Sequence, residues 1–460
     1  MKLPIFRSEN NKNAPAWLAE YNTGRAKTDR QYVCQAPFRA LRFSQSGNIY
    51  FCCHNRFYSL GKYPEISLQE AWGGEKANKF REMIKSFDLS GGCHNCRTHL
   101  ENRNFASAGT TVYDNLSKGN PEFPVMMDFE ISNLCNLECA MCSGENSSMI
   151  RRNREGKEPY PMRYDENFAD QLSHFIPHLH EARFVGGEPF LIDLYYQIWE
   201  RISTINPAVS IQILTNGTVL NQKIIDFVEN NNVHVSFSLD SVVKETYQAI
   251  RQNANYEQVF ANLETIREIS QRKSRNISVN ICAIRQNRME IPEMLRYFSE
   301  KKIAVIFHIV HYPPAHALWG LTYPELAELA AFYKNSALEL RGNIPQADMN
   351  RFLGLMKQVE IWRNKAKMEQ EEILPEEEEL WKELYNQIVR HFQKAEGVDV
   401  VHLSDKYSVR LQAIADMVDD RMLVRRALRN LRGIPIGMLI AELETGSDEV
   451  LLERFIAIAN

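Results

Sequence analysis

The stretch Asp128–Ser143 reads DFEISNLCNLECAMCS and joins the end of an apolar, strand-like run to a loop rich in cysteine. Within that loop, Cys135, Cys139 and Cys142 follow the spacing C-x3-C-x2-C. Three thiolates on one tight loop can hold three corners of a 4Fe–4S cluster and leave one iron free for another ligand. A structural zinc site needs four protein ligands and would leave this trio incomplete. The spacing therefore favours an iron–sulfur cluster with one open iron.

Downstream of this loop, the pattern predicts alternating strands and helices. Between residues 125 and 312 the strand-like runs are VMMDFEIS, EARFVGG, VSIQILTN, VHVSFSLD, NISVNICAI and AVIFHIVHY. Between them we expect helices at Glu166–Leu179, Tyr195–Thr204, Gln222–Glu229, Tyr256–Ser270 and Glu290–Glu300. Repeated strand–helix units predict an α/β fold with a parallel sheet and right-handed crossovers. Six such units fit either an open doubly wound sheet or a barrel that does not fully close.

Polar side chains alternate along several of these predicted strands. They occupy every second position in three sets: His234, Ser236, Ser238 and Asp240; Ser278, Asn280 and Cys282; and Asp128, Glu130 and Ser132. Strands that are covered on both faces should be apolar on both faces. The alternation therefore favours a barrel-like lumen that holds a polar ligand.

A second group of cysteines lies upstream of the predicted barrel. Cys34 and Cys52 are separated by C-x12-G-x4-C, and Cys93 and Cys96 form C-x2-C. On spacing alone, four thiolates in two pairs can bind zinc or an iron–sulfur cluster. Because Cys53 directly follows Cys52, the sequence leaves open which of the two is the ligand.

Composition bounds the classes of protein to which the chain can belong. The 460 residues include 54 basic and 58 acidic side chains, for a net charge of −4, which argues against electrostatic binding of nucleic acid or an anionic membrane surface. No targeting segment and no apolar stretch long enough to span a bilayer is visible, so we expect a cytoplasmic protein. The cytosol keeps thiols reduced, so the clustered cysteines among the nine predict metal ligands rather than disulfides, and the isolated Cys282 is expected to be a small buried hydrophobe.

We expect three domains along the chain. Residues 1–110 form a small cysteine-rich α+β module, with extended pieces at Ala40–Ser44 and Asn48–Cys52 and one helix at Ser67–Phe87. Residues 121–318 form the barrel, and residues 319–460 form a helical region of unknown role. In that region Glu376–Glu379 fits the first turn of a helix. Arginines at helical spacing are expected to pair with acidic neighbours: Arg421, Arg425, Arg429 and Arg432.

Three more motifs follow the cysteine loop in order, each after a predicted strand. They are GGEP (Gly186, Gly187, Glu188 and Pro189), TNG (Thr215, Asn216 and Gly217) and SLDS (Ser238, Leu239, Asp240 and Ser241), and Arg251 lies just beyond the last. With the cysteine trio, this set resembles the radical S-adenosylmethionine (SAM) superfamily. The resemblance implies a partial (β/α)6 barrel in which the three cysteines hold a 4Fe–4S cluster whose free iron binds SAM. It also implies that the residues of these motifs surround SAM, with Glu188 near its ammonium and Arg251 near its carboxylate. Met141 stands where that family usually has an aromatic residue.

The upstream module resembles the twitch or SPASM modules of the same superfamily. That resemblance implies an auxiliary 4Fe–4S cluster held by Cys34, Cys52, Cys93 and Cys96. The module precedes the barrel here, whereas in most relatives it follows the barrel.

The resemblance implies reductive cleavage of SAM to a 5′-deoxyadenosyl radical, hydrogen abstraction from a substrate, and transfer of an electron to the auxiliary cluster. A flavodoxin or a ferredoxin is the expected electron donor. We expect a peptide substrate, with a sugar, an aminocyclitol or a nucleotide as the alternative. Cys282 is a candidate hydrogen donor, which would make the enzyme an epimerase, and His308 and His311 are candidate bases. A non-catalytic metal-binding scaffold is the alternative from another class.

Overall fold

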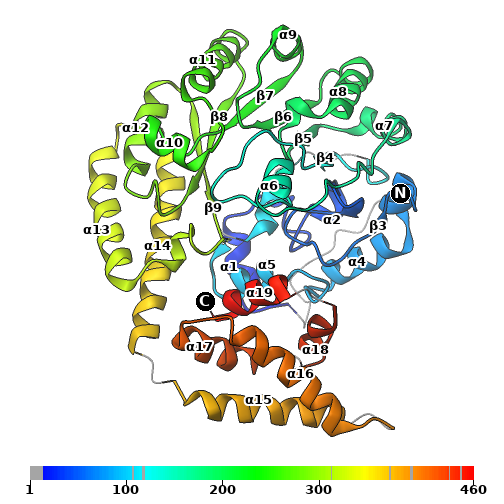
Figure 1. The fold of residues 1–460 in the computed structure, drawn as a ribbon. Coiled ribbons are helices and arrows are strands. Elements are labelled where there is room, and N and C mark those ends of the chain that lie inside the picture. Colours follow the sequence, from blue (N-terminus) through cyan, green and yellow to red (C-terminus); the bar gives the residue numbers. More distant parts are fainter. Residues whose placement is uncertain are drawn as a thin grey trace. The chain divides into compact units, whose positions relative to one another are not determined.

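The computed structural model describes residues 14–105, 108–114, 116, 120–311, 313–371, 374–393, 397–434, 436–445 and 448–459. The chain forms two compact units (Figure 1). The first contains Met1–Leu318 and Leu329–Gln358, and the second contains Trp319–Glu328 and Val359–Asn460. The cysteine-rich module and the barrel therefore share one compact unit.

One nine-stranded sheet runs through the first unit, in the order β3-β2-β1-β4-β5-β6-β7-β8-β9. Its strands are β1 (Ala40–Ser44), β2 (Asn48–Tyr50), β3 (Gly61–Lys62), β4 (Met126–Glu130), β5 (Glu181–Phe184), β6 (Ser210–Thr215), β7 (Val233–Ser238), β8 (Ile277–Ala283) and β9 (Ala304–Ile309). Strand β1 is parallel to β4, and from β4 to β9 each strand is parallel to the next. On the other side of β1, β2 pairs antiparallel with β1, and β3 pairs antiparallel with β2. Strands β3 and β9 are the two edges of the sheet, so the sheet does not close into a full barrel. The six parallel strands β4–β9 form the predicted partial barrel.

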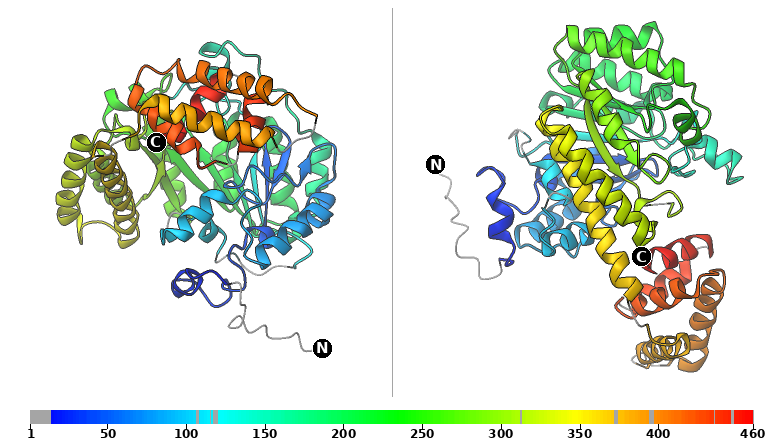
Figure 2. Two further views of the ribbon diagram at one scale, coloured as in Figure 1. Left: turned by 90° about the horizontal axis from the view of Figure 1, so that it is seen from below. Right: turned by 90° about the vertical axis from the view of Figure 1, so that its left-hand side faces the viewer.

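The helices that connect β4–β9 lie along the outside of the sheet (Figures 1 and 2). They are α6 (Ser148–Asn153), α7 (Glu166–Leu172), α8 (Asp193–Ile205), α9 (Gln222–Asn230), α10 (Lys244–Ile250), α11 (Tyr256–Arg272) and α12 (Ile291–Glu300). Side-chain caps fix several starts; Asn221 and Asn255, for example, accept hydrogen bonds from Ile224 and Gln258. The predicted helix Glu166–Leu179 was too long: α7 ends at Leu172, and a 3-10 turn containing Pro177 follows.

Burial alternates along the central strands. On β7, Val233, Val235 and Phe237 are buried, whereas His234, Ser236 and Ser238 are partly exposed. The same alternation runs along β8, whose Ser278, Asn280 and Cys282 are the partly exposed set. The apolar face packs under the helices and the polar face lines the inside of the curved sheet.

The module around β1–β3 has its own helices. These are α1 (Leu18–Thr23), α2 (Ala36–Arg39), α3 (Leu68–Gly73), α4 (Glu75–Lys85) and α5 (His94–Glu101). Among them, α2 contacts both β1 and α4. The single helix predicted at Ser67–Phe87 is wrong, because Gly74 adopts an extended conformation and separates α3 from α4. Glycine lacks the side chain that restricts other residues to helical angles, so a Gly-Gly pair favours such a break.

The edge strand β9 is covered by side chains from a helix of the same unit. The Asp348 carboxylate accepts from Val305 N–H at 3.2 Å, and Arg351 Nη1 donates to Val305 C=O at 3.2 Å. Both residues lie on α14 (Gln346–Glu371), which follows α13 (Tyr323–Leu340). These two bonds take the place of a tenth strand at that point of the edge.

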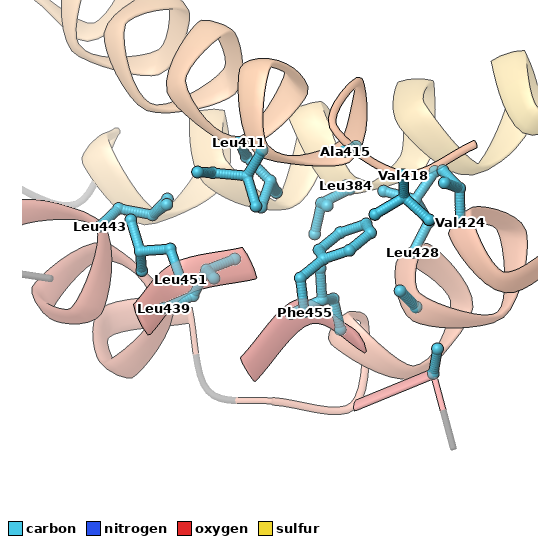
Figure 3. Packing of buried hydrophobic residues seen from close by; sticks show 14 of the residues in the cluster. Leu384, Leu411, Ala415, Val418, Val424, Leu428, Leu439, Leu443, Leu451 and Phe455 are labelled. Carbon is cyan, nitrogen blue, oxygen red and sulfur yellow. The ribbon is translucent and has the colours of Figure 1, made fainter. Parts of the chain in front are cut away.

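The second unit is a helical bundle. Its helices beyond α14 are α15 (Glu377–Phe392), α16 (Val400–Ala415), α17 (Arg421–Leu431), α18 (Ile436–Thr445) and α19 (Asp448–Ala459). Leu384, Leu411, Leu428 and Phe455 point toward one another in its core (Figure 3).

Charged side chains of this bundle pair as expected. Glutamates 377, 378 and 379 occupy the first turn of α15. Arg421 pairs with Glu377, and Arg425 pairs with Glu376 at 3.6 Å. Among the described helices, none is long and apolar enough to cross a bilayer.

Candidate SAM–cluster site and auxiliary cysteine site

The loop that carries Cys135, Cys139 and Cys142 connects β4 to α6 and is closed by its own hydrogen bonds. The Ser148 hydroxyl accepts from Cys135 N–H at 3.1 Å and donates to Cys135 C=O at 3.2 Å. Ser147 Oγ donates to Leu137 C=O at 2.7 Å and also caps α6. The three thiols therefore lie on a loop that is held in shape by its own hydrogen bonds.

The GGEP segment packs directly against this loop. Glu188 N–H donates to Leu134 C=O at 2.7 Å. A Cβ atom on Gly187 would lie 2.1 Å from Leu134 O, and Gly187 has a φ of +48°. Only glycine fits here, because the position combines a left-handed backbone with backbone contact. The GGEP segment and the cysteine loop are therefore in direct backbone contact.

The Glu188 carboxylate is fully buried and is engaged by the TNG segment. Its Oε1 accepts from Thr215 Oγ1 at 2.7 Å and from Phe190 N–H at 3.2 Å, and its Oε2 accepts from Asn216 N–H at 2.7 Å. Burial raises the pKa of Glu188 to about 7 even though these donors lower it. The sequence suggested a contact with the SAM ammonium; in the fold, both oxygens hold the TNG loop.

Asn216 links the TNG segment to the cysteine loop. Its Nδ2 lies 3.9 Å from Cys135 Sγ and 3.0 Å from Asn136 Oδ1. Pro189 is buried behind this contact, at the start of a 3-10 turn. Three sequence motifs that are far apart in the chain, namely the cysteine loop, GGEP and TNG, are therefore in contact around Cys135.

On the other side of the loop, Arg251 lies between Asp240 and Cys139. Its Nε donates to Asp240 Oδ2 at 2.7 Å, and its Nη1 lies 3.8 Å from Cys139 Sγ. Ala140 N–H donates to Ile250 C=O at 2.8 Å, which fixes this part of the loop to the end of α10. Burial by itself lowers the pKa of Arg251, but Asp240 and Cys139 outweigh it and raise that pKa above its ordinary value.

Cys282 and His308 lie on the same inner face, close to this ion pair. Cys282 N–H donates to Asp240 Oδ1 at 2.7 Å, and Cys282 is in register with His308 on β9. Met141 and Cys282 both pack on Ile250, Ile284 and Val310. Ser238, the remaining predicted residue, is in register with Asn280. The fold gathers all predicted residues of this site at the carboxyl ends of the strands.

The donor set fits a cationic iron cluster. Burial raises the pKa of Cys135 to about 11 and that of Cys142 to about 12, and repulsion between neighbouring thiolates adds to the shift. Thiols of this kind stay protonated near neutral pH without a metal, whereas a bound cluster stabilises the thiolate form. These three cysteines would hold the cluster.

The four upstream cysteines, Cys34, Cys52, Cys93 and Cys96, line one cavity. Burial raises the pKa of each of these thiols, and Cys34 is raised further by its neighbours Cys52, Cys93 and Cys96. In the described residues, no three His, Cys, Asp or Glu side chains are close enough to share a single metal ion. The four thiols that line this cavity are the ones that would hold the auxiliary cluster.

Cys53 faces a different environment from Cys52. Its Sγ lies 3.8 Å from the Tyr113 hydroxyl, and burial opposes the contacts with His54 and Arg42 that lower its pKa. It does not line the cavity of the four thiols. The structure therefore separates two residues that the sequence left equivalent, and Cys52 belongs to the cysteine cavity.

Sequence reasoning missed the partner of Asp128. Arg42, on β1 of the module, donates from Nη1 to Asp128 Oδ2 at 2.5 Å and from Nη2 to Glu130. Strand register places Arg42 opposite Asp128. It also missed Asn287, whose Nδ2 donates to Asp240 C=O at 2.7 Å and to Cys282 C=O at 2.9 Å. Neither residue lies in a motif, so only the pairing of distant segments reveals them.

Comparison with known families matches both cysteine groups. The model of the radical SAM superfamily matches residues 129–298, and that of the SPASM iron–sulfur cluster-binding domain matches residues 34–97. A radical SAM domain carries a 4Fe–4S cluster and SAM, and a SPASM domain carries auxiliary iron–sulfur chemistry. The cofactors expected from the sequence are thereby confirmed. For the upstream module, the match favours an iron–sulfur cluster over zinc.

Similar curated proteins match part of the chain. A GTP 3',8-cyclase of Clostridium botulinum is 23% identical over 177 residues, which is 38% of this chain and 53% of that protein. A GTP 3',8-cyclase of Listeria welshimeri is 26% identical over 226 residues, covering 47% of this chain and 65% of that protein. The match thus spans about half to two thirds of the length of these relatives.

Two solved structures are also similar. One is anSMEcpe with bound AdoMet and Cp18Cys peptide, with a TM-score of 0.37 and 17% identity, covering 48% of this chain and 61% of that one. The other is Streptococcus suis SuiB bound to precursor peptide SuiA, with a TM-score of 0.36 and 13% identity, covering 60% of this chain and 62% of that one.

Proposed function

Because the chain belongs to the radical SAM superfamily and carries a SPASM domain ahead of its barrel, we propose that it is an enzyme that cleaves SAM reductively and removes a hydrogen atom from a substrate carbon. When bound, the cluster and SAM supply the carbon-centred 5′-deoxyadenosyl radical that performs this abstraction. The observation that carries the proposal is the contact of Asn216 with Cys135 and of Arg251 with Cys139 on one loop.

The residues around the loop have separate tasks in this proposal. Cys135, Cys139 and Cys142 hold the cluster. The Gly186–Gly187 backbone, Thr215, Asn216, Ser238 and Met141 surround SAM. Glu188 positions the TNG loop from behind, since its oxygens are used within the protein. The partly exposed polar face of β7 and β8 would hold the substrate, and placement of a reactive radical requires that bulk water be kept out of this site.

The module supports net oxidation of the substrate. Cys34, Cys52, Cys93 and Cys96 provide four ligands, and a fully ligated cluster favours electron acceptance over direct binding of substrate. The electron that starts each turnover would come from a flavodoxin or a ferredoxin.

A peptide is the substrate that we propose first, because auxiliary modules of this kind accompany many peptide-modifying relatives. The mixed character of the inner face supports it. Ile306 on β9 is 37% exposed and lies in register with Asn280, so that apolar and polar side chains stand side by side in the lumen. A peptide offers both kinds of surface.

A small polar molecule, such as a sugar, an aminocyclitol or a nucleotide, is the second candidate. The curated relatives named GTP 3',8-cyclase favour a nucleotide. Epimerisation belongs to this candidate as well, with Cys282 returning a hydrogen atom. Turnover in deuterated solvent separates these reactions. An epimerase should place solvent deuterium on the reacting carbon through Cys282, and the Cys282→Ala variant should not incorporate deuterium. An oxidation leaves no solvent deuterium at that carbon in either protein.

The experiment for the core proposal is anaerobic reconstitution, reduction with dithionite and assay for 5′-deoxyadenosine. Wild-type protein should bind about eight irons per chain if both clusters are 4Fe–4S, and it should form 5′-deoxyadenosine from SAM. Cys135→Ala should lose about half of the iron and all of the cleavage. Iron binding without any 5′-deoxyadenosine would support the remaining candidate, a non-catalytic scaffold, and overturn the proposal.

A further inference from the structure

Arg251 contacts Cys139, one of the three expected cluster ligands, directly. Its Nη1 points to Cys139 Sγ at 3.8 Å, within the range of a hydrogen bond to sulfur. Arg251 is 7% exposed, so little solvent screens its charge. The family resemblance assigns Arg251 to the SAM carboxylate; the contact with Cys139 is a second task for the same guanidinium, whose five N–H groups allow both.

Asp240 fixes the guanidinium in this position. Its Oδ2 accepts from Arg251 Nε at 2.7 Å, and its Oδ1 accepts from Cys282 N–H at 2.7 Å. Asn287 donates to the Asp240 carbonyl at 2.7 Å, and Asp240 itself is fully buried. Because the carboxylate is held at both oxygens and the Asp240 backbone at a third point, the guanidinium that it orients cannot swing away from Cys139 without breaking a buried ion pair.

The charges of the pair act on the cluster in opposite directions. Reduction of the cluster adds one negative charge beside Cys139, and the nearby guanidinium favours that charge. The Asp240 carboxylate disfavours it from a greater distance, since it lies behind the guanidinium. In a buried site with low dielectric constant, neither effect is screened away. The contact with the thiolate should therefore raise the reduction potential of the cluster.

We propose that Arg251 and Asp240 form a positioning pair that sets the reduction potential of the SAM-binding cluster through Cys139. The proposal rests on the proposed function in one respect, namely that Cys135, Cys139 and Cys142 hold that cluster. On this proposal, the potential at which the cluster accepts its electron depends on the buried Arg251–Asp240 ion pair as well as on the three cysteines.

The test is a redox titration of the reconstituted holoenzyme, followed by electron paramagnetic resonance and carried out without SAM. Omitting SAM removes any effect of a contact with its carboxylate. For Arg251→Gln, the reduced-to-oxidised ratio of this cluster at a fixed potential should fall about tenfold, equivalent to about 59 mV for one electron. Arg251→Lys keeps the charge and should restore most of the ratio. Asp240→Asn removes the opposing charge and should shift the ratio in the other direction.

Two references make the result specific. The auxiliary cluster serves as an internal reference, because its signal should titrate unchanged in every variant. Arg267→Gln is the matched control, since Arg267 also pairs with an acid, Glu264, but lies on the outer helix α11. A general loss of structure would lower the cluster content, and would not move two variants in opposite directions.

Failure of this proposal is distinguishable from failure of the proposed function. If Arg251→Gln and Asp240→Asn bind the cluster with the wild-type potential, or if both shift it the same way, the positioning pair is refuted while SAM cleavage stands. If the wild-type protein forms no cluster at these cysteines, the proposed function itself fails.

Discussion

Glu188 holds Asn216: its Oε2 accepts the Asn216 backbone N–H at 2.7 Å inside a fully buried pocket. The bond connects the loop after β5 to the loop after β6 and places the Asn216 side chain 3.9 Å from Cys135 Sγ. The Glu188 carboxylate therefore holds the framework of the site together.

Burial raises the pKa of Glu188 from 4.5 to about 7, so folding favours the protonated form. The folded pKa is above the unfolded one, hence this stabilisation is fully present below pH 4.5 and is lost as the pH rises through 7. The loss should amount to about 3 kcal/mol for a shift of this size. Anaerobic thermal unfolding between pH 5 and 8 should show wild-type protein losing stability across this window.

Glu188→Gln removes the titrating group and should flatten the profile, although the amide offers one acceptor fewer and lowers stability at pH 5. Glu166→Gln is the control, because Glu166 is exposed on α7, and it should keep the wild-type slope. Parallel profiles for wild-type protein and Glu188→Gln would show that Glu188 does not titrate in this range.

Gly187→Ala should abolish binding of the SAM-site cluster. The new Cβ atom would lie 2.1 Å from Leu134 O, so the cysteine loop would have to move. Gly156→Ala is a matched control: Gly156 also has a positive φ, of +60°, but its Cβ position meets no atom within 4 Å. The control should cost only the strain of a left-handed alanine, about 1–2 kcal/mol. Iron content after reconstitution is the measurement, with about half the iron lost in Gly187→Ala alone; equal iron in both variants would contradict the steric argument.

Cys52→Ala and Cys53→Ala should differ in iron content. Cys52 lines the cavity with Cys34, Cys93 and Cys96, whereas the Cys53 thiol faces Tyr113. Cys52→Ala should therefore lose the auxiliary cluster and about half of the iron, and Cys53→Ala should keep both clusters. The two variants serve as controls for each other, since each removes one thiol from the same turn. Loss of the auxiliary signal in Cys53→Ala would reverse the assignment.

Arg42→Met should destabilise the first unit strongly. Arg42 is buried and neutralises Asp128 and Glu130 across the β1–β4 pairing, so its removal leaves two carboxylates without their buried partner. Breaking one buried pair costs about 3–5 kcal/mol. Arg56→Met removes a contact to the same Glu130 from a side chain that is 58% exposed, and it should cost less than about 1 kcal/mol. Anaerobic thermal unfolding is the measurement, and equal effects of the two variants would contradict the difference in burial.

The sequence determined the features that depend on local spacing. Three such features are the C-x3-C-x2-C trio after a strand, the alternation of strands with helices, and the polar side chains at every second position of β7 and β8. Each depends only on neighbouring residues, so the partial barrel and both cysteine groups could be predicted. The single helix expected at Ser67–Phe87 failed for a local reason, the extended Gly74.

Only the tertiary structure decided which distant groups meet. It separated Cys52 from Cys53, because consecutive side chains point to different surroundings. It turned Glu188 toward Thr215 and Asn216, paired Arg42 with Asp128, and placed Arg251 between Asp240 and Cys139. These contacts follow from the register of parallel strands that are far apart in the chain, and one residue of shift in that register would turn the side chains to the opposite face of the sheet.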